Sequence, residues 1–290
     1  DDGSDSIDLL RNAAAAMYLA KDRGKNNYQF FTSDLNDEVR ERMVLKNALI
    51  RARERDEFAL FFQPKIDIPS DEIIGVEALM RWHSGSGTEV PPNRLVPILE
   101  EAGMIMEVGE WVIQTACRQY AAWRDAGLPA PRIAVNLSGR QLREPSFVSM
   151  VESVLADAGL GPDCLEIEVT EFMLMSESTN SDVALHALHD MGVRISLDDF
   201  GTGYSSLVYL KRFSIDTIKI DRSFISEITT SADDVEIVKA IITMGHSLNR
   251  RVTAEGVETA EQLAILREYG CDEFQGYLVC PPLPADKIAP

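Results

Sequence analysis

Residues 196–206 read Ser196-Leu197-Asp198-Asp199-Phe200-Gly201-Thr202-Gly203-Tyr204-Ser205-Ser206, and they follow an apolar run that starts at Val193. A short apolar run of this kind predicts a buried strand, so two adjacent carboxylates stand at its C-terminal end. The two glycines then allow a tight turn or the close approach of a ligand. Adjacent carboxylates repel each other, and a site that keeps both ionised usually holds a cation. Oxygen ligands suit Mg²⁺ or Mn²⁺, while a plain polar turn is the alternative.

Composition is typical of a soluble globular protein. The chain has 290 residues, of which 45% are hydrophobic and 26% charged. That length accommodates one large domain or two ordinary ones. The net charge of −19 argues against binding to duplex nucleic acid, because such binding needs a basic patch. A small phosphorylated ligand is still compatible with this charge if metal ions offset it locally.

The cysteines and the hydropathy pattern bear on location. Four scattered cysteines form no Cys-x-x-Cys pair, which argues against a zinc cage or a disulfide framework and predicts a reducing, cytoplasmic location. No apolar run is long enough to span a membrane, so we expect no membrane contact from this segment. The chain begins at Asp1 without an initiator Met, so we expect upstream sequence, in which a membrane anchor is conceivable.

From residue 58 onward, short strands alternate with amphipathic helical stretches. We expect strands at Phe58–Gln63, Ile73–Arg81, Arg132–Asn136, Leu165–Val169, Val193–Asp198, Thr217–Ile220, Arg251–Ala254 and Glu273–Gln275. We expect helices between them at Glu110–Ala126, Gln141–Ala158, Ser178–Met191, Ala232–Leu248 and Ala260–Tyr269. This alternation predicts an α/β fold, a (β/α)₈ TIM-type barrel. Only a turn at 67–72 separates the first two strands, so the first should run antiparallel, in a hairpin. A doubly wound sheet is the alternative, weakened by the missing Gly-x-Gly-x-x-Gly.

The residues before the barrel predict two helices and one short strand. Apolar residues recur at helical spacing over 6–21, and Tyr28-Gln29-Phe30-Phe31 is typical of a strand. Residues 37–55 are rich in charge and predict a linker helix whose charges face solvent.

Polar residues gather where the predicted strands end, which is where barrel enzymes place their chemistry. Strands two to eight supply Glu77, Arg81, Asn136, Glu168, Glu171, Asp198, Asp199, Lys219, Asp221, Glu255, Glu258 and Gln275. Glu77, Glu168 and Lys219 lie inside otherwise apolar runs. Charged side chains are rarely buried unless they are paired or bind a metal, so this set predicts a functional mouth.

The residue types at this mouth suit phosphoryl chemistry. Carboxylates and one carboxamide can hold two divalent ions, with Asp198 placed to bridge them. Two such ions clamp the attacking water and the leaving oxygen of a phosphoryl displacement. Lys219 could lower the pKa of the attacking water or offset charge on the phosphate. Arg81 could hold a phosphate oxygen with its planar fork. The prediction is metal-assisted phosphodiester hydrolysis.

One segment carries a family signature. Gly75-Val76-Glu77-Ala78-Leu79-Met80-Arg81-Trp82 resembles the signature of EAL domains, the bacterial phosphodiesterases that open cyclic di-GMP to linear 5′-pGpG. The resemblance extends over residues 57–290. It includes Gln63-Pro64, Asn136-Leu137-Ser138, Glu168-Val169-Thr170-Glu171, Asp198-Asp199-Phe200-Gly201-Thr202-Gly203, Ile218-Lys219-Ile220-Asp221, Ala254-Glu255-Gly256-Val257-Glu258 and Gln275-Gly276-Tyr277.

The resemblance implies roles for these residues. A first Mg²⁺ or Mn²⁺ would be held by Glu77, Asn136, Glu168 and Asp198. A second would be held, partly through waters, by Asp198, Asp199 and Glu255. Lys219 would position or activate the water, so the catalytic set is Lys219, Glu255 and Glu77. Substrate contacts are expected from Gln63, Leu79, Arg81 and Gln275.

Further implications concern loops, assembly and domains. Glu171, Glu258 and Asp221 would anchor loops at the rim, and Glu171 would hold the Gly-rich loop. A symmetric homodimer through the helices after strands five and six is implied. The sequence departs from the family at Cys280-Pro281-Pro282, where a basic residue more often precedes the proline. This departure could alter ligand binding at the rim.

The first residues resemble a second family. Leu9-Leu10-Arg11-Asn12-Ala13, Ala16 to Lys21 and Asn26-Asn27-Tyr28 are similar to the last helix and strand of a GGDEF diguanylate cyclase domain, without its signature. We therefore divide the chain into a GGDEF remnant (1–33), a linker helix (34–56) and the EAL barrel (57–290).

Two other functions stay open at this level. Some EAL domains bind cyclic di-GMP without cleaving it, although such receptors typically lose metal ligands or the Gly-rich loop, which this chain keeps. An enolase-like barrel would use Lys219 as a base with Mg²⁺. A test on phosphodiester substrates would distinguish an enolase-like function from a phosphodiesterase function.

Overall fold

The structure is a computed structural model that describes residues 5–22, 28, 30–52, 55–84, 89–175, 179–202, 210 and 212–288. By internal contacts the chain forms two compact units. Unit 1 comprises Asp1–Phe58 and Trp82–Ala102, and unit 2 comprises Ala59–Arg81 and Gly103–Pro290. None of the helices in the described part is long and apolar enough to cross a membrane.

Unit 1 is largely helical. Helix α1 (Ser6–Asp22) contacts α2 (Ser33–Ala52), which in turn contacts α3 (Pro92–Glu101). The expected solvation of the α2 charges is wrong for Arg42, whose Nη2 lies 2.7 Å from Glu101 Oε1 on α3. The strand expected at 28–31 does not form at Tyr28, Phe30 or Phe31, and Gln29 lies outside the described residues. A strand needs a pairing partner, and the described part of unit 1 offers these residues none.

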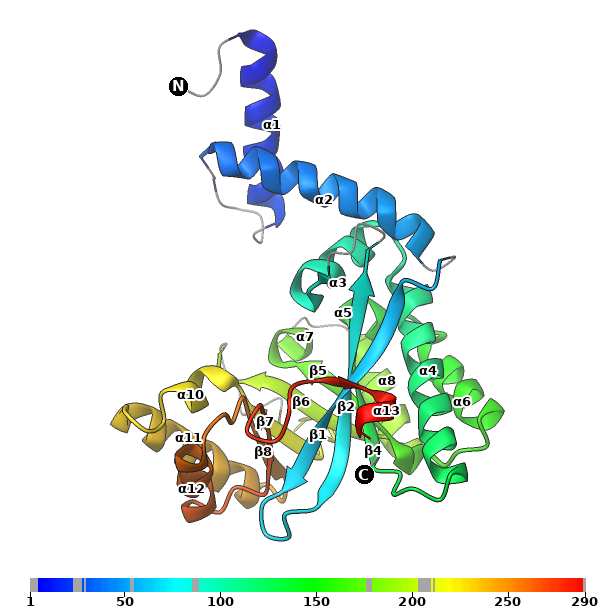
Figure 1. The fold of residues 1–290 in the computed structure, drawn as a ribbon, viewed down its shortest axis with the longest axis vertical. Helices are drawn as coiled ribbons and strands as arrows, with labels where there is room; N and C mark the ends of the chain where they lie inside the picture. The colour runs from blue at the N-terminus through cyan, green and yellow to red at the C-terminus, as the bar shows by residue number, and fades with distance from the viewer. Residues whose placement is uncertain are drawn as a thin grey trace. The chain divides into compact units, whose positions relative to one another are not determined.

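Unit 2 contains a closed barrel (Figure 1). Its eight strands are β1 (Phe58–Asp67), β2 (Ile73–His83), β4 (Arg132–Asn136), β5 (Leu165–Thr170), β6 (Arg194–Phe200), β7 (Thr217–Ile220), β8 (Arg251–Glu255) and β9 (Glu273–Gln275). Neighbours from β2 through β9 pair in parallel, whereas β1 pairs antiparallel with β9 and also pairs with β2. The predicted barrel with a reversed first strand is confirmed.

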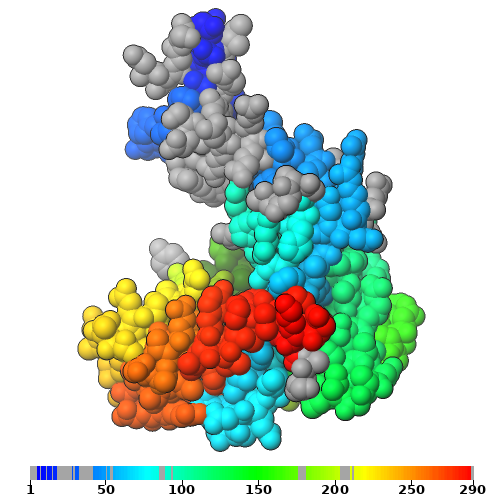
Figure 2. Space-filling view, in the orientation of Figure 1, coloured from blue at the N-terminus to red at the C-terminus, as the bar shows by residue number. Residues whose placement is uncertain are grey.

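Two short strands extend the barrel sheet. β3 (Glu89–Val90) pairs with β2, and β10 (Leu283–Pro284) pairs with β1. In the space-filling view the C-terminal segment, in red, lies beside the cyan β1–β2 hairpin (Figure 2). Both pairings involve only two residues of each short strand, which is too little pattern for a sequence to reveal.

The helices between the strands follow the predicted order. They are α4 (Ile105–Asp125), α5 (Gly139–Leu142), α6 (Phe147–Asp157), α7 (Glu171–Met175), α8 (Thr179–Met191), α10 (Arg222–Ser226), α11 (Ala232–Ser247), α12 (Ala260–Glu268) and α13 (Ala285–Ile288), with a 3₁₀ turn at Pro162–Cys164. The single helix expected over 141–158 is wrong, because it is divided between α5 and α6. Pro145 lies at the break, where it cannot supply the backbone N–H that a continuous helix needs.

Successive side chains along the strands point alternately to the outside and to the interior of the barrel. The outward positions are buried and apolar, and they pack in one core against the helices: Val76, Ala78, Ile133, Val135, Leu165, Ile167, Val169, Ile195, Leu197, Ile218, Ile220, Val252, Ala254 and Phe274. The alternate positions face the barrel interior and are buried polar groups: Lys65, Glu77, Glu166, Glu168, Ser196, Asp198, Thr217, Lys219, Thr253, Glu273 and Gln275. The barrel is therefore filled with charge instead of the branched apolar side chains usual in this fold.

We predict that Gly276→Ala destabilises the barrel where β9 ends. A Cβ there would lie 2.1 Å from Val257 O, a backbone atom that cannot swing away. Overpacking of this kind costs about 1–3 kcal/mol, measured by thermal or urea unfolding. The control is Gly75→Ala in β2, where a Cβ would meet no atom closer than 3.4 Å. Equal stability of the two variants would contradict the prediction.

Candidate active site

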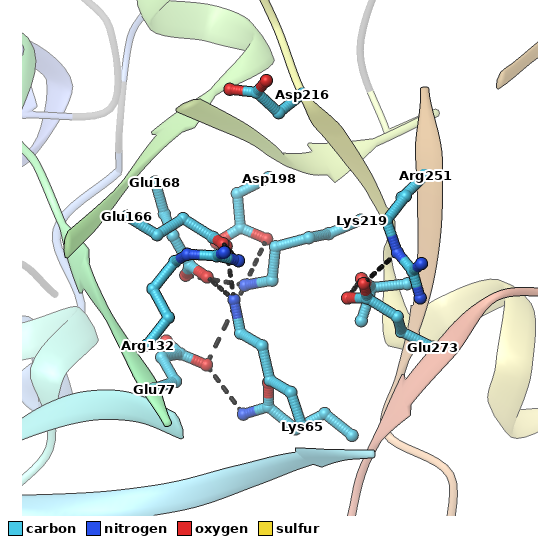
Figure 3. Close-up of polar contacts among 12 residues, drawn as sticks. Lys65, Glu77, Arg132, Glu166, Glu168, Asp198, Asp216, Lys219, Arg251 and Glu273 are labelled. Carbon is cyan, nitrogen blue, oxygen red and sulfur yellow. Dashed lines mark hydrogen bonds and ion pairs between the residues drawn. The ribbon is translucent and has the colours of Figure 1, made fainter. Parts of the chain in front are cut away.

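Lys219 is the centre of the charged group at the barrel mouth (Figure 3). Its side chain is 1% exposed, and its Nζ lies 2.5 Å from Glu255 Oε1 and 2.7 Å from Glu168 Oε2. The same nitrogen lies 3.1 Å from Asp198 Oδ1 and 3.8 Å from Glu77 Oε2. Strands β2, β5, β6 and β8 thus each aim one carboxylate at a single ammonium group on β7.

Glu77 is held by two amide side chains. Asn136 Nδ2 donates to its Oε1 at 2.6 Å, and Gln275 Nε2 donates to its Oε2 at 2.8 Å. Gln275 Nε2 also donates to Gln63 Oε1 at 2.9 Å, and Gln63 Nε2 donates to the Cys280 carbonyl at 3.1 Å. Because Asn136 uses its NH₂ group on Glu77, its amide oxygen is the atom left for a cation.

The adjacent residues Asp198 and Asp199 lie at an irregularity in β6. The register with β7 shifts between Leu197 and Phe200, and Asp199 has a φ of 54°. A bulge with a left-handed residue re-aims side chains at the end of a strand. As a result Asp198, Asp199 and Glu255 each bring a carboxylate oxygen within 4.8 Å of the others, a grouping that could hold a metal ion.

A second buried lysine lies below the mouth. Lys65 Nζ donates to Glu168 Oε1 at 2.6 Å and to Glu166 Oε1 at 2.7 Å. Arg132 Nη1 lies 3.7 Å from Glu166 Oε2. Glu168 therefore has one oxygen on Lys65 and the other on Lys219, and the charged group continues from the rim into the barrel.

The pKa values of these groups follow from burial and charge. Burial raises the pKa of Glu168, but Lys219 and Lys65 outweigh it and hold the value at about 2. Burial and the neighbouring carboxylates raise the pKa of Glu77 and of Asp199. The pKa of Glu255 is raised to about 8 by burial and by Asp198, against the opposing effect of Lys219. The carboxylates at the mouth therefore repel one another more than Lys219 alone offsets, and a bound cation would relieve that repulsion.

The structure also locates the other predicted site residues. Arg81 lies half-buried with its guanidinium 5.6 Å from the centre of the Phe61 ring, and Leu79 is half-buried on the same strand. Glu171 is buried and accepts from the Gly201 N–H at 3.5 Å, as a loop anchor would. The remainder of that loop, 203–209, lies outside the described residues.

Asp221 and Glu258, the two other residues predicted to anchor loops, differ in their contacts. Asp221 caps α10 by accepting from the Ser223 N–H at 3.0 Å, so it fixes the turn after β7. Glu258 is exposed, and its backbone N–H donates to Gln262 Oε1 at 2.7 Å. Gln63 and Gln275, predicted to touch substrate, are buried and bonded to protein, although Gln275 Oε1 has no partner among the described residues.

Sequence reasoning missed Lys65 and Glu166. The polar residues predicted from strand ends came from strands two to eight, whereas the first strand, which runs the opposite way, was predicted to end at Gln63, before Lys65. A signal was present, because Gln63, Lys65 and Asp67 occupy alternate positions and so continue the strand pattern beyond Gln63.

The chain belongs to the EAL domain family, which it matches over residues 46–282. It is 44% identical over 99% of its length to the bifunctional diguanylate cyclase/cyclic di-GMP phosphodiesterase MucR of Pseudomonas aeruginosa. It is 41% identical over 98% of its length to the cyclic di-GMP phosphodiesterase NbdA of the same organism. The chain spans 42% and 36% of the lengths of these two relatives.

A solved structure agrees with the fold. The phosphodiesterase PaMucR in complex with c-di-GMP superposes with a TM-score of 0.81 at 44% identity, covering 84% of this chain and 99% of that one. The barrel and its order of strands are thus those of a known EAL domain.

We predict that Lys219→Met destabilises the metal-free protein and makes it respond more strongly to Mn²⁺. The change leaves buried carboxylates without their cation, which costs about 3–5 kcal/mol. Thermal unfolding in EDTA and in Mn²⁺ measures both effects. The control is Lys287→Met at an exposed position of α13. A variant as stable as this control, or one that Mn²⁺ stabilises no more than the parent, would contradict the prediction.

Proposed function

We propose that this chain is a phosphodiesterase that hydrolyses cyclic di-GMP to linear 5′-pGpG and so lowers a bacterial second messenger. The observation that supports it most is the convergence of Glu77, Glu168, Asp198 and Glu255 on Lys219, with Asn136 bonded to Glu77. Two relatives over nearly the whole chain are named cyclic di-GMP phosphodiesterases.

The donor set fits Mg²⁺ or Mn²⁺, and we propose two ions per site. All donors are carboxylate or amide oxygens, which these hard cations prefer. We assign the first ion to Glu77, Asn136, Glu168 and Asp198, and the second to Asp198, Asp199 and Glu255, of which the last three already converge. When bound, such ions polarise the phosphodiester and lower the pKa of the attacking water.

The chain's own residues then supply the rest of the reaction. Water attacks phosphorus, one P–O3′ bond breaks, and the product carries a 5′-phosphate and a free 3′-hydroxyl. Glu255 is the proposed proton acceptor, because its carboxylate lies at the mouth beside Asp198 and Asp199 and 2.5 Å from Lys219 Nζ. Lys219 stays cationic, since Asp198 and Glu168 outweigh the effect of burial on its pKa, and it offsets charge growing on the phosphate. Arg81 and Leu79 lie on β2 beside Glu77, where they would hold the substrate.

We also propose a symmetric homodimer and a tandem origin. The dimer would form through the helices that follow β6 and β7, and Glu171 with its bond to Gly201 would couple that interface to Asp198 and Asp199. Residues 1–33 would be the end of a GGDEF domain. In support, α1 exposes Leu9, Leu10 and Met17, as a helix does that normally packs inside a larger domain.

The decisive test is cleavage of cyclic di-GMP in Mg²⁺, followed by chromatography of the nucleotides. The parent should release pGpG, and EDTA should stop the release. Glu77→Gln should lower kcat/KM by at least the roughly 10–100-fold that loss of a group orienting a metal ligand costs. The matched control is Glu72→Gln, an exposed residue of the same hairpin, which should keep full activity.

The other outcomes separate the alternatives. Saturable binding of cyclic di-GMP without product would favour a receptor over an enzyme. Absence of both binding and cleavage would overturn the proposed function.

A further inference from the structure

Lys65 is buried below the mouth, and Glu168 is the carboxylate at the rim with which its ion pair is found in the described part of the chain. It is 3% exposed and comes from β1, the reversed strand. Among the described residues its Nζ bonds two carboxylates, Glu166 Oε1 at 2.7 Å and Glu168 Oε1 at 2.6 Å. Lys219, in contrast, lies within 4.0 Å of four carboxylates.

The two carboxylate oxygens of Glu168 therefore have different partners. Oε1 is bonded to Lys65, and Oε2 lies 2.7 Å from Lys219, in the group that includes Asp198 and Glu255. A cation at the mouth can compete with Lys219 for Oε2 without disturbing the bond to Lys65. If Lys65 were absent, the carboxylate could rotate and the oxygen facing the mouth would not be fixed.

Lys65 is itself held in place from below. Glu166 accepts from its Nζ, and Arg132 Nη1 lies 3.7 Å from the other oxygen of Glu166. The order Arg132, Glu166, Lys65, Glu168 alternates in charge. Such a chain fixes the ammonium group in one position, because each member balances the next.

We propose that Lys65 is a positioning residue that sets the cation affinity of the mouth by holding Glu168 with Oε2 toward it. The inference rests on the proposed function, because it takes Glu168 as a metal ligand. Residues that orient a metal ligand through a hydrogen bond typically change metal affinity by about 10–100-fold when they are replaced.

The test measures Mn²⁺ binding by isothermal titration calorimetry on the whole chain. The main variant is Lys65→Met/Glu166→Gln, which removes one positive and one negative charge together, so that no extra charge is left buried. Lys65→Met alone is the second variant. We expect the dissociation constant for Mn²⁺ to rise about tenfold or more in each folded variant.

The control removes another ion pair between neighbouring barrel strands, in which Glu273 is buried and the Arg251 side chain is 43% exposed. Arg251 Nε lies 2.5 Å from Glu273 Oε1, and neither residue bonds a carboxylate of the mouth in the described structure. Arg251→Met/Glu273→Gln should lower the unfolding temperature but leave the affinity for Mn²⁺ at the parent's value. The comparison separates loss of stability from loss of positioning.

A second readout uses the cleavage of cyclic di-GMP. In the Lys65 variants the Mn²⁺ concentration for half-maximal rate should rise, while the rate at saturating Mn²⁺ stays close to that of the parent. A merely structural role would lower the active fraction without moving the half-maximal concentration.

The possible results of these measurements distinguish failure of the inference from failure of the proposed function. Parent-like Mn²⁺ affinity in the double variant overturns the inference, as does an equal loss in the Arg251 control. A parent that neither binds Mn²⁺ nor cleaves cyclic di-GMP overturns the proposed function instead.

Discussion

The carboxylate of Glu168 lies between two buried ammonium groups, and the arrangement of the barrel interior depends on it. An isolated carboxylate in such a place would take up a proton, because burial of a lone charge is too costly. Lys65 and Lys219 instead hold its pKa at about 2. Each lysine then requires further negative charge, which Glu166 supplies below and Asp198 and Glu255 supply above. Removal of one member therefore leaves its neighbours with less opposite charge.

This requirement explains how the barrel wall is built. With charge inside, the apolar cohesion of the domain comes from the outer faces of the strands, where residues such as Ile167, Leu197 and Ile218 are fully buried against helices. Buried ion pairs add little net stability compared with apolar packing of the same volume. What they do provide is fixed oxygen positions, which the proposed cation site requires.

The sequence predicts the barrel strands well, because the alternation of inward and outward side chains along a strand is a local property. All eight strands form where apolar runs predict them, although β1 continues beyond its predicted end at Gln63 to Asp67. Glu77, Glu168 and Lys219 are conspicuous as charges within such runs. Long-range pairings are different. Lys65 and Glu166 are 101 residues apart, and their contact exists only once the barrel has closed with its particular stagger. The break between α5 and α6 was readable from Pro145 but was outweighed by helical spacing.

The reversed first strand explains why Lys65 escaped a search of strand ends. In β1 the earlier residues approach the mouth and the later ones descend, so Gln63 bonds Gln275 near the rim, Lys65 lies deeper, and Asp67 reaches Arg251 at 2.7 Å. One strand thus places polar side chains at three depths of the barrel. The C-terminal-end rule for parallel barrels must therefore be inverted for β1, because a strand's direction decides which of its residues face the mouth.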